Sequence, residues 1–158
     1  MDFPEDIYSA RILEVVAQMP EMDLLEAYHG RAVRHSKLCG SRVEVTLCLD
    51  EAGHISAYGQ KVEACLLGQT SAAVMARTAI GLGIGDVREV RAKMAAMLKE
   101  DGPPPGGIWQ DLEVLHAVRD FKPRHASMLL VFDAVIEAFE QAAAHLGIVL
   151  ELAPVEAE

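Results

Sequence analysis

Positive charge is scarce in this sequence. Lys and Arg number 14 against 24 Asp and Glu, which gives a formal net charge of -10. A protein that binds phosphates needs clustered Lys and Arg, because their charge displaces the counterions of the nucleic acid or the lipid surface. The composition therefore argues against a partner that is a nucleic acid and against an acidic membrane surface.

Long apolar runs are missing as well. No stretch approaches the roughly 18 apolar residues that a membrane-spanning helix needs, and residues 1–7 carry acids where a signal peptide carries a basic region. We therefore expect a cytoplasmic protein without a membrane segment. A chain of 158 residues, 51% of them apolar, can bury the core of one domain. We expect that domain to cover residues 1–158, with a frayed acidic tail at 154–158.

Cysteine occurs only three times, at Cys39, Cys48 and Cys65. An odd number of cysteines in a cytoplasmic chain argues against a disulfide framework. Reduced thiols or metal ligands are the better interpretation of these residues.

Two of the cysteines, Cys39 and Cys65, flank a predicted β-hairpin. Residues 42–50 alternate apolar and polar side chains, which is typical of a half-buried strand. Glu51-Ala52-Gly53 has the composition of a three-residue turn with glycine in the left-handed position. The sequence therefore predicts two antiparallel strands that bring the chain back from Cys39 to Cys65.

The turn also predicts a register. Paired residue numbers sum to 104 along the ladder, so that Val45 faces Gly59. Continued outward, this register sets Cys39 opposite Cys65, at a separation of about 5 Å if pairing extends that far. Cys48 points to the other face and lies about 30 Å from Cys39, because a strand rises about 3.3 Å per residue. We therefore expect Cys39 and Cys65 to share a site that Cys48 cannot join.

Helical spacing of apolar residues marks most of the remaining chain. We expect an edge strand within residues 24–36 and helices at 7–19, 69–80, 87–99, 111–117 and 124–146. These elements predict an α+β fold class, a two-layer domain with a small antiparallel sheet of about three strands covered on one face by helices.

Three segments of the sequence resemble the NifU/IscU-like family of iron-sulfur cluster assembly scaffolds. They are Leu38-Cys39-Gly40, Cys65 before the small-residue helix Gln69-Thr70-Ser71-Ala72-Ala73, and Arg124-His125-Ala126-Ser127-Met128-Leu129, which is similar to the family's His-Cys-Ser-Met-Leu stretch. The longer connection before the last segment is similar to the SufU-like branch. The resemblance covers most of residues 6–146 and implies a SufE/NifU-like fold.

The sequence departs from the family at two ligand positions. Ser41 stands where the family has aspartate, and no cysteine occurs near Ala126. An alignment that differs by one residue would place His125 itself in the cysteine's position. In either alignment His125 is the nitrogen ligand that the resemblance offers, although a histidine on the apolar face of a helix is often a core residue instead.

The resemblance implies a metal or cluster site with one open position. Its ligands are Cys39, Cys65 and His125, and Ser41 and Ser127 are neighbours that could hydrogen-bond to a thiolate. A structural zinc ion takes four ligands, so three leave room for water, a partner's thiolate or a cluster sulfide. Cys65 also precedes a helix, where backbone amides and the helix dipole favour the thiolate. Its alternative interpretation is a small buried apolar residue.

The function implied is that of a scaffold. The protein would bind iron or a labile nascent iron-sulfur cluster, receive sulfur from a cysteine desulfurase and serve recipient apo-proteins. One alternative is a zinc-binding or metal-free sulfur acceptor with a persulfide on Cys65 or Cys39, and another is a degenerate member kept as an interaction module. We expect a scaffold or acceptor rather than an enzyme, and the sequence leaves open whether it forms a homo-oligomer.

Overall fold

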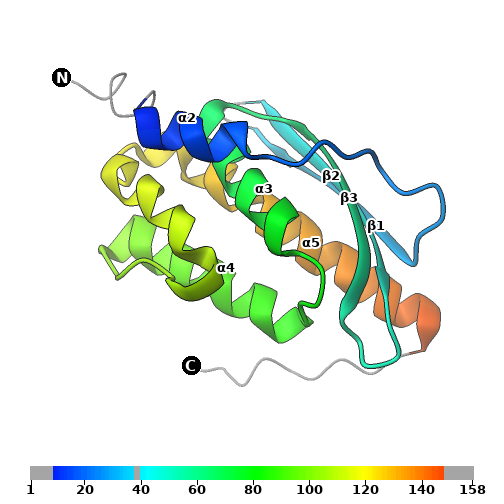
Figure 1. Ribbon diagram of the computed structural model, residues 1–158. Coiled ribbons are helices and arrows are strands. Elements are labelled where there is room, and N and C mark those ends of the chain that lie inside the picture. Colours follow the sequence, from blue (N-terminus) through cyan, green and yellow to red (C-terminus); the bar gives the residue numbers. More distant parts are fainter. Residues whose placement is uncertain (1–8, 38–39, 148–158) are drawn as a thin grey trace.

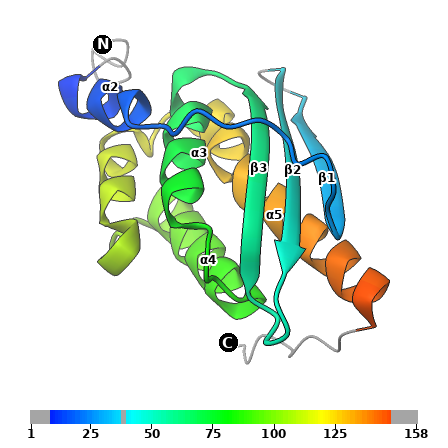
Figure 2. The same cartoon turned by 45° about the vertical axis from the view of Figure 1, so that its right-hand side comes forward.

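A three-stranded antiparallel sheet packs against helices on one of its faces, as Figures 1 and 2 show. The computed structural model describes residues 9–37 and 40–147. The sheet has the order β1-β2-β3, with strands Gly30–Ser36, Ser41–Leu49 and Ile55–Glu63. The expected α+β class is therefore confirmed. Cys39, the start of the expected helix at 7–19 and the tail at 154–158 lie outside the described residues.

The helices follow the predicted order along the chain. They are α2 (Ala10–Ala17), α3 (Leu66–Thr78), α4 (Ile84–Glu100), the 3-10 helices η1 (Gly107–Val118) and η2 (Lys122–Arg124), and α5 (His125–Leu146). α5 is the longest and packs along β1 and β2, while α3 and α4 pack against α5. Among the described residues, none of the helices combines the length and the apolar character that crossing a membrane requires.

The core lies between the sheet and α5. Val43, Val45 and Leu47 of β2 point inward and are almost completely buried, and they meet Phe132 and Phe139 of α5 in one apolar cluster. The approach of α5 to β1 is close enough to require glycine at position 30. A Cβ atom built on Gly30 would lie 2.0 Å from the carbonyl oxygen of Ala138.

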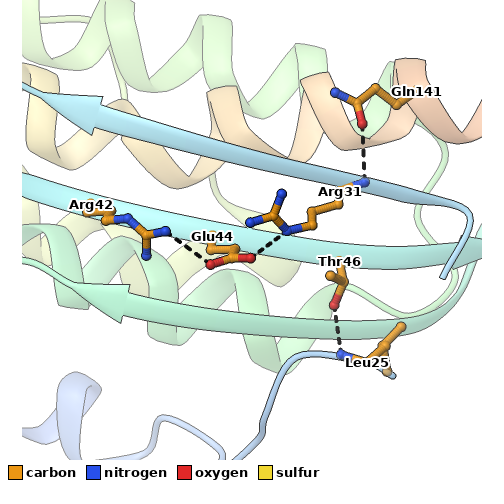
Figure 3. Close-up of polar contacts among 6 residues, drawn as sticks. All are labelled: Leu25, Arg31, Arg42, Glu44, Thr46 and Gln141. Carbon is orange, nitrogen blue, oxygen red and sulfur yellow. Dashed lines mark hydrogen bonds and ion pairs between the residues drawn. The ribbon is translucent and has the colours of Figure 1, made fainter. Parts of the chain in front are cut away.

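A polar layer covers the outer face of the sheet. The chain between α2 and β1 crosses this face, where the backbone N–H of Leu25 donates to Oγ1 of Thr46 over 2.9 Å. Beside it, the carboxylate of Glu44 accepts hydrogen bonds from Arg31 at 2.6 Å and from Arg42 at 3.2 Å (Figure 3). Glu44 is therefore a buried carboxylate with two arginine partners.

The predicted hairpin register is correct at the turn and wrong along the rest of the ladder. Leu49 pairs with Ile55, as a sum of 104 requires, but Val45 pairs with Gln60 rather than with Gly59. A β-bulge between these points causes the shift: Cys48 pairs with Ala57, so Ser56 is an extra residue on β3. A bulge of this kind leaves one residue unpaired and moves the register by one position.

Several predicted boundaries also differ from those observed. The strand expected within 24–36 is confined to Gly30–Ser36, and the helix expected at 69–80 begins at Leu66 with Cys65 as its N-cap residue. The short helix expected at 111–117 is part of the longer η1, which has 3-10 geometry. The early start of α3 matters most, because it places Cys65 directly at a helix N-terminus.

Candidate functional site

Cys65 occupies the corner between β3 and α3. It has extended backbone angles, is half-buried and is the N-cap residue of α3. The backbone N–H groups of Gly68 and Leu67 and the side chain of Arg124 donate hydrogen bonds toward its sulfur. The corner therefore directs backbone and side-chain donors at one sulfur atom.

Two serines complete the surroundings of Cys65. The Oγ atom of Ser127 lies 3.3 Å from the Sγ atom of Cys65 and 2.9 Å from the Oγ atom of Ser41. Ser41 begins β2 and Ser127 lies in the first turn of α5, and each is only 1% exposed. The starts of β2, α3 and α5 thus meet at one end of the sheet, and three side chains in contact join them.

These contacts favour the thiolate form of Cys65. Burial raises the pKa of the Cys65 thiol, but the hydrogen bond from Ser127 lowers it, and the donors Gly68, Arg124 and Leu67 lower it further. The net result is a pKa below that of a free cysteine. The thiolate is the form of cysteine that acts as a nucleophile and as a metal ligand.

His125 lies at the first position of α5 and is 7% exposed. Its Nε2 atom donates a hydrogen bond to the carbonyl oxygen of Arg119. A carbonyl oxygen only accepts, so Nε2 carries a hydrogen, and in a neutral imidazole the lone pair would then be on Nδ1. His125 could therefore serve a metal ion only through Nδ1.

The structure decides which residue of the first turn of α5 faces Cys65. Ala126 is exposed, whereas Ser127 is buried against Cys65 and Ser41. Ser127 is thus the side chain in this turn that contacts Cys65, rather than Ala126, with which the resemblance compares the missing cysteine. Cys48, in agreement with the sequence, lies elsewhere, with its Sγ atom 3.6 Å from the carbonyl oxygen of Ala27.

The predicted metal ligands are only partly within the described structure. Cys39 lies outside it, and the described residues hold no group of three His, Cys, Asp or Glu side chains placed to bind a metal ion. The set Cys39, Cys65 and His125 therefore stays a prediction. Sequence reasoning missed Arg124 and Gly68 as members of the site, and for Gly68 the reason is that the helix was expected to begin at residue 69 rather than at Leu66.

The chain is similar to proteins of known structure. It is 43% identical to a nitrogen-fixing NifU-like protein (N-terminal) from Brucella abortus, with a TM-score of 0.83 and with coverage of 89% of this chain and 97% of that chain. It also shares the fold of a putative iron-sulfur cluster assembly scaffold protein for the SUF system from Fervidobacterium islandicum AW-1, at 18% identity, a TM-score of 0.74 and coverage of 85% and 98%. No protein-family model and no curated protein matches the chain.

Proposed function

This chain belongs to the NifU-like family, and on that basis we propose that it acts in iron-sulfur cluster assembly as an acceptor of sulfur from a cysteine desulfurase. The observation that carries the proposal is the convergence of Ser127, Arg124 and the first amides of α3 on the sulfur of Cys65. Sulfur acceptance needs one activated thiolate, and the lowered pKa of Cys65 supports this role. The sulfur would then pass to recipient apo-proteins or into a cluster.

The transfer step is a thiol exchange. The thiolate of Cys65 attacks the outer sulfur of a persulfide on the desulfurase, and a new sulfur-sulfur bond forms at Cys65. The sulfur-sulfur bond of the donor breaks, and its electron pair leaves with the donor's cysteine as a thiolate. The product on Cys65 is a persulfide, and no external oxidant or reductant is needed. Hydrogen bonds from Ser127 and the α3 amides stabilise the attacking sulfur.

Binding of iron or of a nascent cluster is the second candidate function, and family membership favours it. Among the described residues, the site supplies one thiolate, two neutral hydroxyls and the cation of Arg124, a donor set that suits an anionic sulfur better than a dication. Iron, zinc or a cluster would need Cys39 as a second thiolate and Nδ1 of His125. Such a site would be open and its occupant labile.

The two functions separate in one set of anaerobic experiments. The full chain is incubated with a cysteine desulfurase and L-cysteine, and peptide mass spectrometry locates added sulfur. We expect one sulfur atom on Cys65, its loss in Cys65→Ser and its retention in Cys48→Ser. Reconstitution with iron and sulfide, followed by visible absorption, tests the cluster. A desulfurase that binds the chain yet leaves no sulfur on it, together with no absorption, would favour an interaction module instead.

A further inference from the structure

Ser127 links the accepting sulfur to a second buried hydroxyl. Its Oγ atom contacts the Sγ atom of Cys65 at 3.3 Å and the Oγ atom of Ser41 at 2.9 Å. We propose that Ser127 is the positioning residue for sulfur transfer at Cys65 and that Ser41 supports it. This inference rests on the proposed function and names the side chains that orient the acceptor.

The chemistry of the three groups fixes the direction of the hydrogen bonds. A thiolate has no hydrogen to give, so the hydroxyl of Ser127 must donate to Cys65. Ser127 has only one hydroxyl hydrogen, and its oxygen therefore accepts from Ser41. Both serines are 1% exposed, so water does not compete for these hydrogen bonds. Each bond in such a chain polarises the next and strengthens it.

The packing around Gly68 is a second observation that bears on the position of the Ser127 hydroxyl. A Cβ atom built on Gly68 would lie 2.6 Å from Oγ and 3.2 Å from the carbonyl oxygen of Ser127. With the Ser127 hydroxyl in this position, the first turn of α3 can approach α5 this closely only without a side chain at position 68. The backbone N–H of the same glycine donates toward Sγ of Cys65. One glycine thus makes room for Ser127 and contributes a donor beside it.

The geometry bears directly on the transfer step. In-line attack requires the Sγ lone pair to point at the outer sulfur of the donor along the axis of the bond that breaks. A side chain held in one rotamer reaches that alignment more often than a freely rotating one. Ser127 and the amides of α3 approach Cys65 from different elements, so together they restrict where its sulfur can lie.

The test compares Ser127→Ala with a matched variant, Ser71→Ala. Ser71 is also fully buried between α3 and α5, where its hydroxyl donates to the carbonyl of Met128 over 2.7 Å, but it does not contact Cys65. The rate of sulfur transfer from a desulfurase is measured against donor concentration for each variant, together with the melting temperature. Glutathione persulfide serves as a second donor that needs no protein contact.

We expect Ser127→Ala to lower the maximal transfer rate to Cys65 about 10-fold with both donors, with the apparent KM for the desulfurase unchanged. Ser41→Ala leaves the direct contact in place and should lower the rate by a smaller factor, about 3-fold. Ser71→Ala should lower the melting temperature to a similar degree yet transfer sulfur within about 2-fold of the parent.

A second pair of variants tests the room that Gly68 provides. Gly68→Ala should displace the Ser127 hydroxyl and reproduce the rate loss of Ser127→Ala, whereas Gly85→Ala, in α4 with nothing within 4 Å of its new Cβ, should not.

Equal rates in the parent and Ser127→Ala would overturn this inference alone. Equal rate losses in Ser127→Ala and Ser71→Ala would overturn it too, because the effect would then follow stability. A parent that takes no sulfur on Cys65 overturns the proposed function and this inference with it.

Discussion

The hydroxyl of Ser127 contacts both Ser41 and Cys65, so the side chain at position 127 determines which group lies next to the sulfur of Cys65. A helix turns by about 100° per residue, so adjacent positions at the start of α5 point in very different directions. Ser127 therefore faces the site while Ala126 faces solvent. The family resemblance identified the segment and compared the missing cysteine with Ala126 or His125, but the contact with Cys65 is made by Ser127. The sequence alone does not fix the rotation of a helix about its axis.

The first prediction concerns these two positions. Replacing Ser127 by Cys and Ser41 by Asp should raise the affinity for iron or zinc at least ~10-fold, which is ~1.4 kcal/mol, because two anionic ligands join Cys65. Ala126→Cys with Ser41→Asp is the matched control and should gain less, since position 126 is exposed. Anaerobic titration monitored with a competing chelator measures both. Equal affinities in the two variants would contradict the assignment of Ser127 to the ligand position.

The second prediction concerns the pH dependence of Cys65. Its pKa is lowered in the fold, so its alkylation by iodoacetamide should stay fast to lower pH than in the urea-unfolded chain. The stabilisation of the fold by this thiolate is present above the unfolded-state pKa and is lost as the pH falls through the folded-state pKa. Ser127→Ala should move the alkylation midpoint upward. A midpoint at or above that of the unfolded chain would show that burial outweighs the donors.

At the scale of secondary structure, periodicity predicted the strands and helices but not the bulge. Alternation in residues 42–50 identified β2, and the turn at Gly53 was correct. The extra residue on β3 had a signal in the sequence, because the inward residues Ile55 and Tyr58 are three positions apart rather than two. A strand with unbroken alternation would have placed those two side chains on opposite faces of the sheet.

The third prediction tests the ion pairs that join β1 to β2. Burial raises the pKa of Glu44, but the hydrogen bond and charge of Arg31, followed by those of Arg42, outweigh it and hold the pKa below its usual range. Glu44→Gln should therefore destabilise the fold by about 1 to 3 kcal/mol at neutral pH. The carboxylate contributes fully above the unfolded-state pKa, and its contribution is lost as the pH falls through the folded-state pKa.

Urea unfolding of the parent and of Glu44→Gln at several pH values measures this difference. The gap between the two proteins should narrow as the medium becomes acidic, because the parent then loses its charge. A gap that stays constant from neutral to acidic pH would assign the effect to packing rather than to the ion pairs. Glu63→Gln, at the exposed end of β3, serves as the control and should change stability little.

The fourth prediction concerns the packing of β1 on α5. In Gly30→Ala the new Cβ would meet the backbone carbonyl of Ala138, which cannot move without displacing the helix. We expect a loss of about 3 kcal/mol or more, at the upper end of what overpacked cores show. Gly85→Ala again provides the control, and thermal unfolding compares them. A Gly30→Ala variant as stable as the parent would mean that β1 can shift away from α5 at little cost.

On the scale of the whole molecule, the site is a junction of elements that lie far apart in the chain. Ser41, Cys65 and Ser127 come from β2, α3 and α5, and side-chain hydrogen bonds close the junction. The resemblance predicted one site formed by Cys39, Cys65 and His125, which stays a prediction, and within the described residues Cys65 contacts Ser127 at the start of the last helix. The role of Ser127 as the link between the other two emerges only once the three elements are packed.

The last prediction concerns how this junction is held together. The starts of α3 and α5 are joined by the contact of Cys65 with Ser127 and by a buried apolar cluster that includes Leu67 and Met128. Folding should therefore not depend on an ion, and EDTA should change the melting temperature by no more than about 1 °C, which for a domain of this size corresponds to a few tenths of a kcal/mol.

A ligand that binds only the folded state stabilises it in proportion to the logarithm of its concentration over its dissociation constant. Zinc bound through Cys65 should thus raise the melting temperature in the parent but not in Cys65→Ser. A steep fall of the melting temperature in EDTA would instead make a bound metal part of the fold, as in small zinc domains that unfold when the ion is removed.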